Sequence, residues 1–221
     1  MHDRDAVIAR IYGSFGTNEY PGDPFLQGSF EGCEPFDEVG PFRGRADWRA
    51  LDAPFLDGHG AALSFFSEAG FRFFLPAYLV ADLREELQSA DPLFHLTHGF
   101  TETDVRIPMG GRVFVRRVGR SAYINPRRYG AMTTYDHARH RLSIFPREEA
   151  AAIVAYLELK RAADIHGDDA ERIDGALDLF WRERARSAPT HEELARHLAA
   201  EREIFEAMSS RNSKDEKEVG T

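Results

Sequence analysis

One apolar stretch, from Leu63 to Leu83, constrains the fold of this chain more than any other feature of its sequence. Its large side chains recur at the three- and four-residue spacing of one helical face, and Ser67 precedes them as a helix cap. Pro76 interrupts the pattern, and a proline inside a helix costs about 3 kcal/mol. We therefore predict two helical pieces that meet in a kink near Leu75, with Pro76 opening the second piece. Their shared face comprises Phe71, Phe74, Leu75, Tyr78, Leu79 and Leu83.

Further helices are predicted by the same spacing elsewhere in the chain. One lies at the N-terminus, one follows Pro146, and one follows Asp168. Thr190 and Glu193 form the sequence pattern of a capping box and predict the start of a last helix. The apolar stripes of these four helices consist of Ile8, Ile11, Tyr12 and Phe15; Ala150, Ile153, Val154 and Leu157; Ile173, Ala176, Leu177, Phe180 and Trp181; and Leu194, Leu198 and Phe205.

Two segments depart from helical spacing. Residues 17–60 are rich in glycine and proline, which predicts an ordered but irregular loop. Aromatic side chains should anchor it: Phe25, Phe30, Phe36, Phe42, Trp48 and Phe55. Residues 105–115 alternate between apolar and polar around Gly110-Gly111, which predicts a small β-hairpin with arginine on its outer face.

These patterns predict a mainly α fold, a compact helical domain with a small β-hairpin insertion and an irregular aromatic N-terminal loop. Residues 1–208 form a single globular domain in this interpretation, and the polar residues 209–221 form a disordered tail. No apolar run approaches the roughly 18 residues of a membrane span, so we expect no membrane partner. The polar N-terminus does not resemble a secretory signal, and Cys33 is the only cysteine. Both observations favour a cytoplasmic location.

The charges of the chain are strongly separated along the sequence. The formal net charge is −9. Between Glu19 and Asp57 lie nine acidic and three basic residues, whereas residues 105–147 hold ten arginines and a single acid, Asp136. The arginines alternate with aromatic side chains and give bidentate hydrogen bonds to oxyanions. This span is therefore the principal candidate for a binding surface.

Three interpretations of the arginine-rich span remain open. In the first, the acidic loop folds against the span and neutralises it; in the second, the span binds an acidic protein surface. In the third, it binds nucleic acid, which the net negative charge makes the least favoured. The candidate partner-binding residues are Arg112, Arg116, Arg117, Arg127, Arg128 and Trp48.

Several histidine and carboxylate patterns in the sequence resemble catalytic or metal-binding motifs without completing one. His95 with His98, and His137 with His140, have a spacing that places two imidazoles on one helical face. Two ligands do not make a metal site, however, and the neighbouring arginines repel a cation. Glu171, Asp174 and Asp178 have the pattern of a solvated helix face, and the acids beside Cys33 disfavour a reactive thiolate. We therefore expect no catalytic residue, metal or cofactor.

The block Phe74-Leu75-Pro76-Ala77-Tyr78 resembles a family of uncharacterised bacterial domains of unknown function. The loop around Cys33-Glu34 and Trp48, the helix after Phe145, and the segment Ala176–Trp181 are similar to that family as well. The arginine-rich insertion and the polar tail depart from it. The resemblance implies a compact bacterial domain and supplies no activity, cofactor or site residue.

The sequence thus favours a non-enzymatic protein-interaction module. The alternatives are an enzyme with an unrecognised site, in a cleft between residues 71–83 and the acidic loop, and a weak nucleic-acid binder that uses the arginine-rich hairpin.

Overall fold

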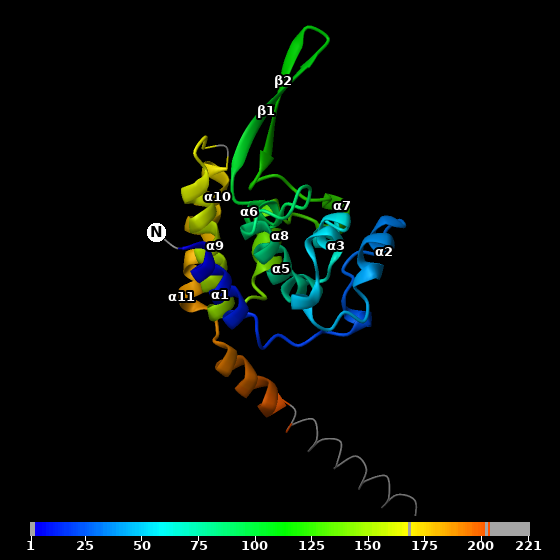
Figure 1. Cartoon of the computed structure of the whole chain (residues 1–221). Helices are drawn as coiled ribbons and strands as arrows, with labels where there is room; N and C mark the ends of the chain where they lie inside the picture. Colours follow the sequence, from blue (N-terminus) through cyan, green and yellow to red (C-terminus); the bar gives the residue numbers. More distant parts are fainter. Residues whose placement is uncertain (1–2, 168, 202, 204–221) are drawn as a thin grey trace, which may run out of the picture.

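The apolar stripe of residues 68–83 forms one helix, α5 (Glu68–Leu83), in the middle of a helical body (Figure 1). The structure is a computed structural model and describes residues 3–167, 169–201 and 203. Ser67 caps α5 as predicted, since its hydroxyl accepts a hydrogen bond from the backbone N–H of Gly70 at 3.0 Å. The prediction of two helical pieces is wrong, because α5 continues through Pro76. Twelve of its sixteen residues are buried, and this packing offsets the hydrogen bond that proline removes.

Helices from both ends of the chain pack beside α5. The N-terminal helix α1 (Arg4–Ser14) contacts α5 and α9 (Arg147–Ala163). A second group contacts α9: α10 (Ala170–Ala176), the π-helical turn η4 (Leu177–Trp181) and α11 (Arg182–Ser187). The predicted stripes supply the buried contacts, and Trp181 also donates a 2.8 Å hydrogen bond from its indole to the carbonyl of Leu96.

The N-terminal segment 17–60 contains more helix than predicted. It forms η1 (Asp23–Phe25), α2 (Glu34–Val39), η2 (Gly40–Phe42), η3 (Trp48–Ala50) and α3 (Ala53–Gly58). A proline stands in the first turn of four of these, where its missing N–H costs no hydrogen bond. The prolines therefore begin short helices instead of only breaking longer ones. Phe42 and Trp48 are buried as predicted, but Phe25, Phe30 and Phe36 are exposed, so their predicted anchoring role is wrong.

Four short helices complete the body. They are α4 (Ala62–Phe65), α6 (Pro92–Thr97), α7 (Pro126–Tyr129) and α8 (Thr134–Leu142). Asp91 caps α6 by accepting a hydrogen bond from the N–H of Phe94, and Thr133 with Asp136 forms a capping box at α8. These caps fix α6 and α8, whose side chains line a recess described below.

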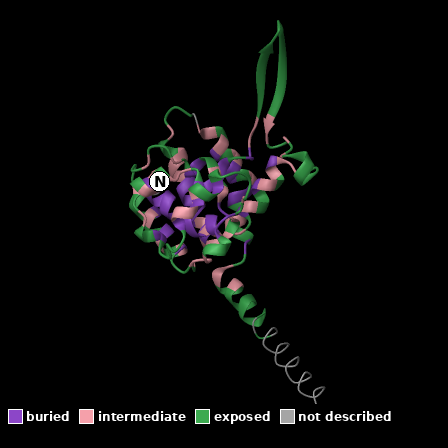
Figure 2. Cartoon of the chain, turned by 90° about the vertical axis from the view of Figure 1, so that its right-hand side faces the viewer, coloured by how far each residue is buried: buried purple, intermediate pink, exposed green. Residues whose placement is uncertain are grey.

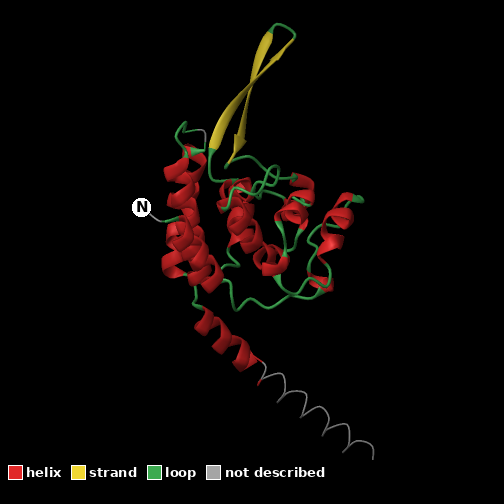
Figure 3. Cartoon of the chain, viewed as in Figure 1, coloured by secondary structure: helices red, strands yellow, loops and turns green. Residues whose placement is uncertain are grey.

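Two elements project from the body (Figures 2 and 3). One is the hairpin of β1 (Glu102–Met109) and β2 (Arg112–Gly119). The other is the helix that begins at residue 191, where Thr190 and Glu193 form the predicted capping box. The predicted fold class, mainly α with a small β-hairpin, is confirmed. Phe205 and the predicted tail 209–221 lie outside the described residues.

Candidate functional site

The β1–β2 hairpin, which we call the arm, has the tight turn that the sequence predicts. Met109 pairs with Arg112, and Gly110 and Gly111 between them have φ values of 56° and 77°. Positive φ at both central residues is the geometry of a two-residue hairpin turn whose twist matches that of the strands. The arm is therefore a regular hairpin, and it extends away from the helical body (Figure 1).

Apolar side chains of the arm are exposed to solvent. Phe114 is 49 % exposed and Val113 is 63 % exposed, and four others share this property: Val105, Ile107, Met109 and Val115. Directly paired residues of an antiparallel hairpin present their side chains on the same face. One face thus combines Val105, Ile107, Met109 and Phe114 with Arg112 and Arg116. We call it the apolar arm face.

The predicted arginines occupy three different environments. Arg112 and Arg116 lie on the apolar arm face. Arg117 lies on the opposite face, where its Nε is 3.0 Å from Asp104 Oδ1 and 3.2 Å from Glu102 Oε1. Its ion pairs raise its pKa, since the two carboxylates stabilise the charged guanidinium. Arg127 and Arg128 lie in α7, near the base of the arm.

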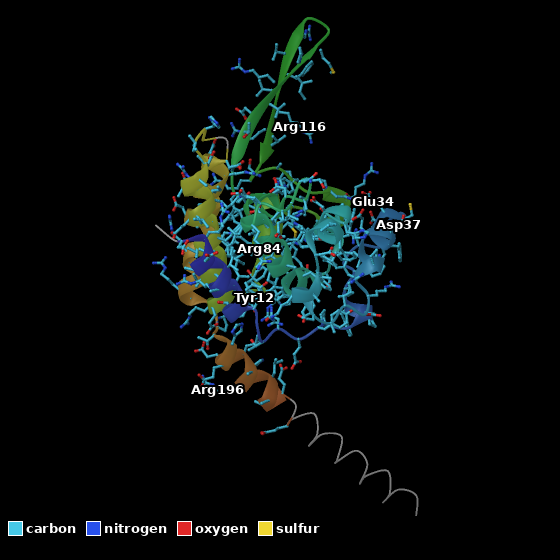
Figure 4. The ribbon with its side chains drawn as sticks, in the orientation of Figure 1. Tyr12, Glu34, Asp37, Arg84, Arg116 and Arg196 are labelled. Atoms are coloured by element: carbon cyan, nitrogen blue, oxygen red, sulfur yellow. The ribbon has the colours of Figure 1, made fainter. Side chains whose placement is uncertain are left out.

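The acidic N-terminal segment reaches this arginine-rich span at one described ion pair. Arg128 Nη1 is 2.7 Å from Glu31 Oε1. Across the described ranges, the side chains of Arg106, Arg112, Arg116 and Arg127 form no ion pair. Figure 4 places Arg116 on the arm, well apart from Glu34 and Asp37 of α2. Neutralisation by the acidic segment therefore applies to Arg128 and does not extend to the arm.

Trp48 is placed differently from the arginines. It is 1 % exposed and its ring stacks on Tyr12 with centroids 5.3 Å apart. In the described part of the chain its indole N–H has no hydrogen-bond partner. A role for Trp48 in binding stays a prediction, and we leave it out of the proposed interface because its side chain offers almost no surface.

The enzyme alternative requires a cleft between α5 and the acidic segment. One cavity of about 590 Å³ borders α5 and the acidic segment and is lined by Glu19, Arg72 and His191, but Arg72 and His191 already contact the carboxylate of Glu149. A second cavity, of about 540 Å³, lies between α5 and residues 48–54. Its charged lining residues are Arg49, Asp52, Arg84 and Glu86. Asp52 already accepts a hydrogen bond from the N–H of Phe55 at 2.9 Å, as the cap of α3. Among the residues that the structure describes, no histidine lines this cavity, which leaves it without the residue type most often used for proton transfer near neutral pH.

The histidine pairs are partly brought together by α6 and α8. His95, His98 and His137 line a recess of about 200 Å³ with Arg141, whereas His140 is exposed on α8 and does not line it. Throughout residues 3–167, 169–201 and 203, no group of three His, Cys, Asp or Glu side chains has a metal-binding arrangement. No local pattern in the sequence indicates that Arg141 faces inward beside these histidines.

A second buried charge was also missed. Glu149 is fully buried, and Arg72 pairs with it through two hydrogen bonds of 2.8 and 2.7 Å. His191 Nε2 lies 3.0 Å from the same carboxylate. In the sequence Glu149 resembles an ordinary first-turn acid, because nothing local reveals its distant partners. This cluster joins α5, α9 and the last helix, so we assign it a structural role.

The remaining candidate acids lie at the surface, where they form ion pairs or are exposed to solvent. Asp174 pairs with Arg161 and Asp178 with Arg182, while Cys33 is exposed. These contacts agree with the interpretation of residues 171–178 as a surface.

The fold and the arm define a class: a mainly helical domain that presents an exposed, arginine-bearing β-hairpin. No protein-family model matches the chain, and no curated protein or solved structure is significantly similar to it. The resemblance to uncharacterised bacterial domains therefore stays a prediction. Of the helices that the structure describes, none combines the length and apolar content needed to cross a membrane.

Proposed function

We propose that this protein is a non-enzymatic interaction module of the bacterial cytoplasm, and that its arm docks onto an acidic surface of another protein. The observation that carries the proposal is the apolar arm face, where exposed Val, Ile, Met and Phe side chains surround Arg112 and Arg116. When a partner covers the exposed apolar groups of a projecting element, the free energy of the complex is lowered.

The charge of the arm indicates the chemistry of the partner. Arg112 and Arg116 have no carboxylate partner among the described residues, so both guanidinium groups are available for bidentate hydrogen bonds to carboxylates. Interfaces are enriched in arginine and in aromatic and Met side chains, which is the composition of this face. An acidic surface with an apolar centre is the complement that satisfies both properties.

The proposal is tested by photo-crosslinking inside cells from position 114, which lies on the apolar arm face. We expect one specific protein product, and we expect Arg112→Glu with Arg116→Glu to abolish it, because charge reversal repels an acidic partner. Arg10→Glu with Arg186→Glu is the matched control, since both arginines are exposed on the body and the net charge changes equally. This control should retain the product.

Three outcomes would contradict the proposal. A crosslinked product that nuclease removes would show that the arm contacts nucleic acid and would support the nucleic-acid alternative instead. Absence of any arm-specific product, or equal loss in the control variant, would show that the arm is not a docking surface.

A further inference from the structure

The recess between α4, α6 and α8 lies outside the arm and has no part in the proposed interaction. Its polar lining consists of Ser64 from α4, His95 and His98 from α6 and its end, and Thr134, His137 and Arg141 from α8. At about 200 Å³ it is smaller than the sites that hold drug-sized ligands. It has room for a small ion or for one end of a larger molecule.

Among the described residues that line the recess, Arg141 alone is permanently charged, and it is held in place from two sides. Its guanidinium lies over the ring of Phe71, with 4.5 Å from Cζ to the ring centroid, and Nη2 donates a hydrogen bond to the carbonyl of Leu63. Burial lowers its pKa, which means that the charged form loses hydration there.

No carboxylate compensates this charge at ion-pair distance. Glu68 attracts Arg141 through space, but within the described ranges Arg141 takes part in no ion pair. Positive charges removed from water are normally paired, because an uncompensated one is costly. A half-buried arginine that faces a recess without a counterion is therefore the feature that points to an anionic ligand.

The histidines make the recess a set of neutral hydrogen-bond donors. The pKa of His95 is lowered to about 4, mainly by burial and to a smaller extent by the charge of Arg141. The same two causes, in the same order, lower the pKa of His137. Burial also lowers the pKa of His98. Near pH 7 each ring is uncharged and offers one N–H donor and one acceptor nitrogen. Thr134 is already engaged, because its hydroxyl donates to the carbonyl of Ala122 at 3.0 Å.

We propose that this recess binds a phosphate group, with Arg141 as the charged ligand and Ser64, His95, His98 and His137 as neutral hydrogen-bonding partners. A metal cation is disfavoured because Arg141 repels it. A carboxylate has only two oxygens, whereas a phosphate presents more oxygens and a titratable proton, and so matches a site with several donors and acceptor nitrogens. The ligand is either free inorganic phosphate or the phosphate end of a monoester.

The test is a titration of the whole protein with inorganic phosphate at constant ionic strength, followed by the imidazole signals in ¹H–¹⁵N NMR spectra. We expect saturable shifts of His95, His98 and His137 with a dissociation constant of about 1 mM or lower. His140 serves as the internal control, because it is exposed on the same helix outside the recess and should not shift.

Two variants connect the binding to Arg141. Arg141→Lys keeps the charge but removes the planar fork, and we expect it to weaken phosphate binding about 10-fold or more. Arg139→Lys changes an exposed arginine of α8 in the same way and should leave the affinity unchanged. If Arg141→Lys unfolds, His137→Phe takes its place, with an expected weakening of about 5-fold from the loss of one hydrogen bond.

A parallel titration with phenyl phosphate distinguishes the two sources. Binding of both compounds indicates the phosphate end of a larger molecule, and binding of inorganic phosphate alone indicates the free ion; either result supports the proposal. It would be overturned by unsaturated or absent histidine shifts up to about 50 mM of both compounds. It would also be overturned by equal weakening in Arg141→Lys and Arg139→Lys.

Discussion

The helical body and the arm use the same types of apolar residue in opposite ways. In the body, Phe145 and Trp181 are fully buried against other aromatic rings. In the arm, Phe114 and Val113 are about half exposed or more, although they belong to a regular antiparallel hairpin. The apolar surface of the body is therefore buried on folding, whereas that of the arm stays exposed to solvent and accessible to a partner. The difference separates residues that maintain the fold from residues that are free to bind.

The largest expected contrast is between two phenylalanines. Phe145→Ala should lower the free energy of unfolding by about 3–5 kcal/mol, because it removes a fully buried ring and leaves a cavity. Phe114→Ala on the arm should change it by less than about 1 kcal/mol. Urea unfolding monitored by circular dichroism measures both values. Similar losses in the two variants would break the distinction between body and arm.

The buried ion cluster gives the next largest effect. Glu149→Ala should cost about 3 kcal/mol, since it removes a fully buried carboxylate and leaves the half-buried Arg72 guanidinium without its ion-pair partner. Glu171→Ala is the matched control, because Glu171 is also a first-turn acid but is exposed, and it should cost less than about 1 kcal/mol. The same unfolding experiment applies. A cost for Glu149→Ala as small as that of the control would remove the structural role assigned to the cluster.

His95 makes the stability of the body depend on pH. Its pKa in the folded protein is lowered to about 4, so the unfolded chain binds its proton more readily. Stability from the neutral form is therefore present above the unfolded pKa of roughly 6.5 and is lost as the pH falls toward 4. Between pH 7 and pH 4.5 the expected loss is about 2–3 kcal/mol.

This loss is isolated by comparing the wild type with His95→Gln. Other groups also titrate in this range, and those that act on His95 are Arg141, Asp91 and His98. The variant should show a pH dependence shallower by the amount expected for His95. Identical slopes in both proteins would contradict the assigned burial of this ring.

The smallest effect concerns the turn of the arm. Replacement of Gly110 and Gly111 by Ala forces two Cβ-bearing residues into positive φ, at a cost of about 1–2 kcal/mol each. Hydrogen exchange of β1 and β2 should accelerate, while the melting temperature of the body changes by less than about 2 °C. A large fall in that temperature would show that the arm and the body unfold together.

Sequence spacing predicted the elements whose stability is mainly local. Ser67, Thr190 and Gly110-Gly111 all act in the predicted caps and turn, because each depends on residues two to four positions away. The predicted break at Pro76 is wrong because the burial of α5, a tertiary effect, overrides the local preference of proline. The predicted anchoring role is wrong for Phe25, Phe30 and Phe36, because composition does not tell which aromatic residues face inward.

The candidate sites show the same division. The arginine-rich span was visible in the sequence, but the pairing register was needed to place Arg112 and Arg116 on the apolar arm face and Arg117 on the other. The recess was not predictable, because it unites α4, α6 and α8 and depends on the inward position of Arg141. Only the relative placement of these helices reveals it.

The central claim is that the arm is not needed for the fold. It is tested most directly by replacing residues 103–118 with Gly-Gly between Glu102 and Gly119, which are already paired across the hairpin, and measuring the free energy of unfolding in urea. We predict a value within about 1 kcal/mol of the full-length chain, because the removed apolar side chains are exposed apart from the half-buried Val118. A loss of about 3 kcal/mol or more would show that the arm stabilises the body and would contradict the account.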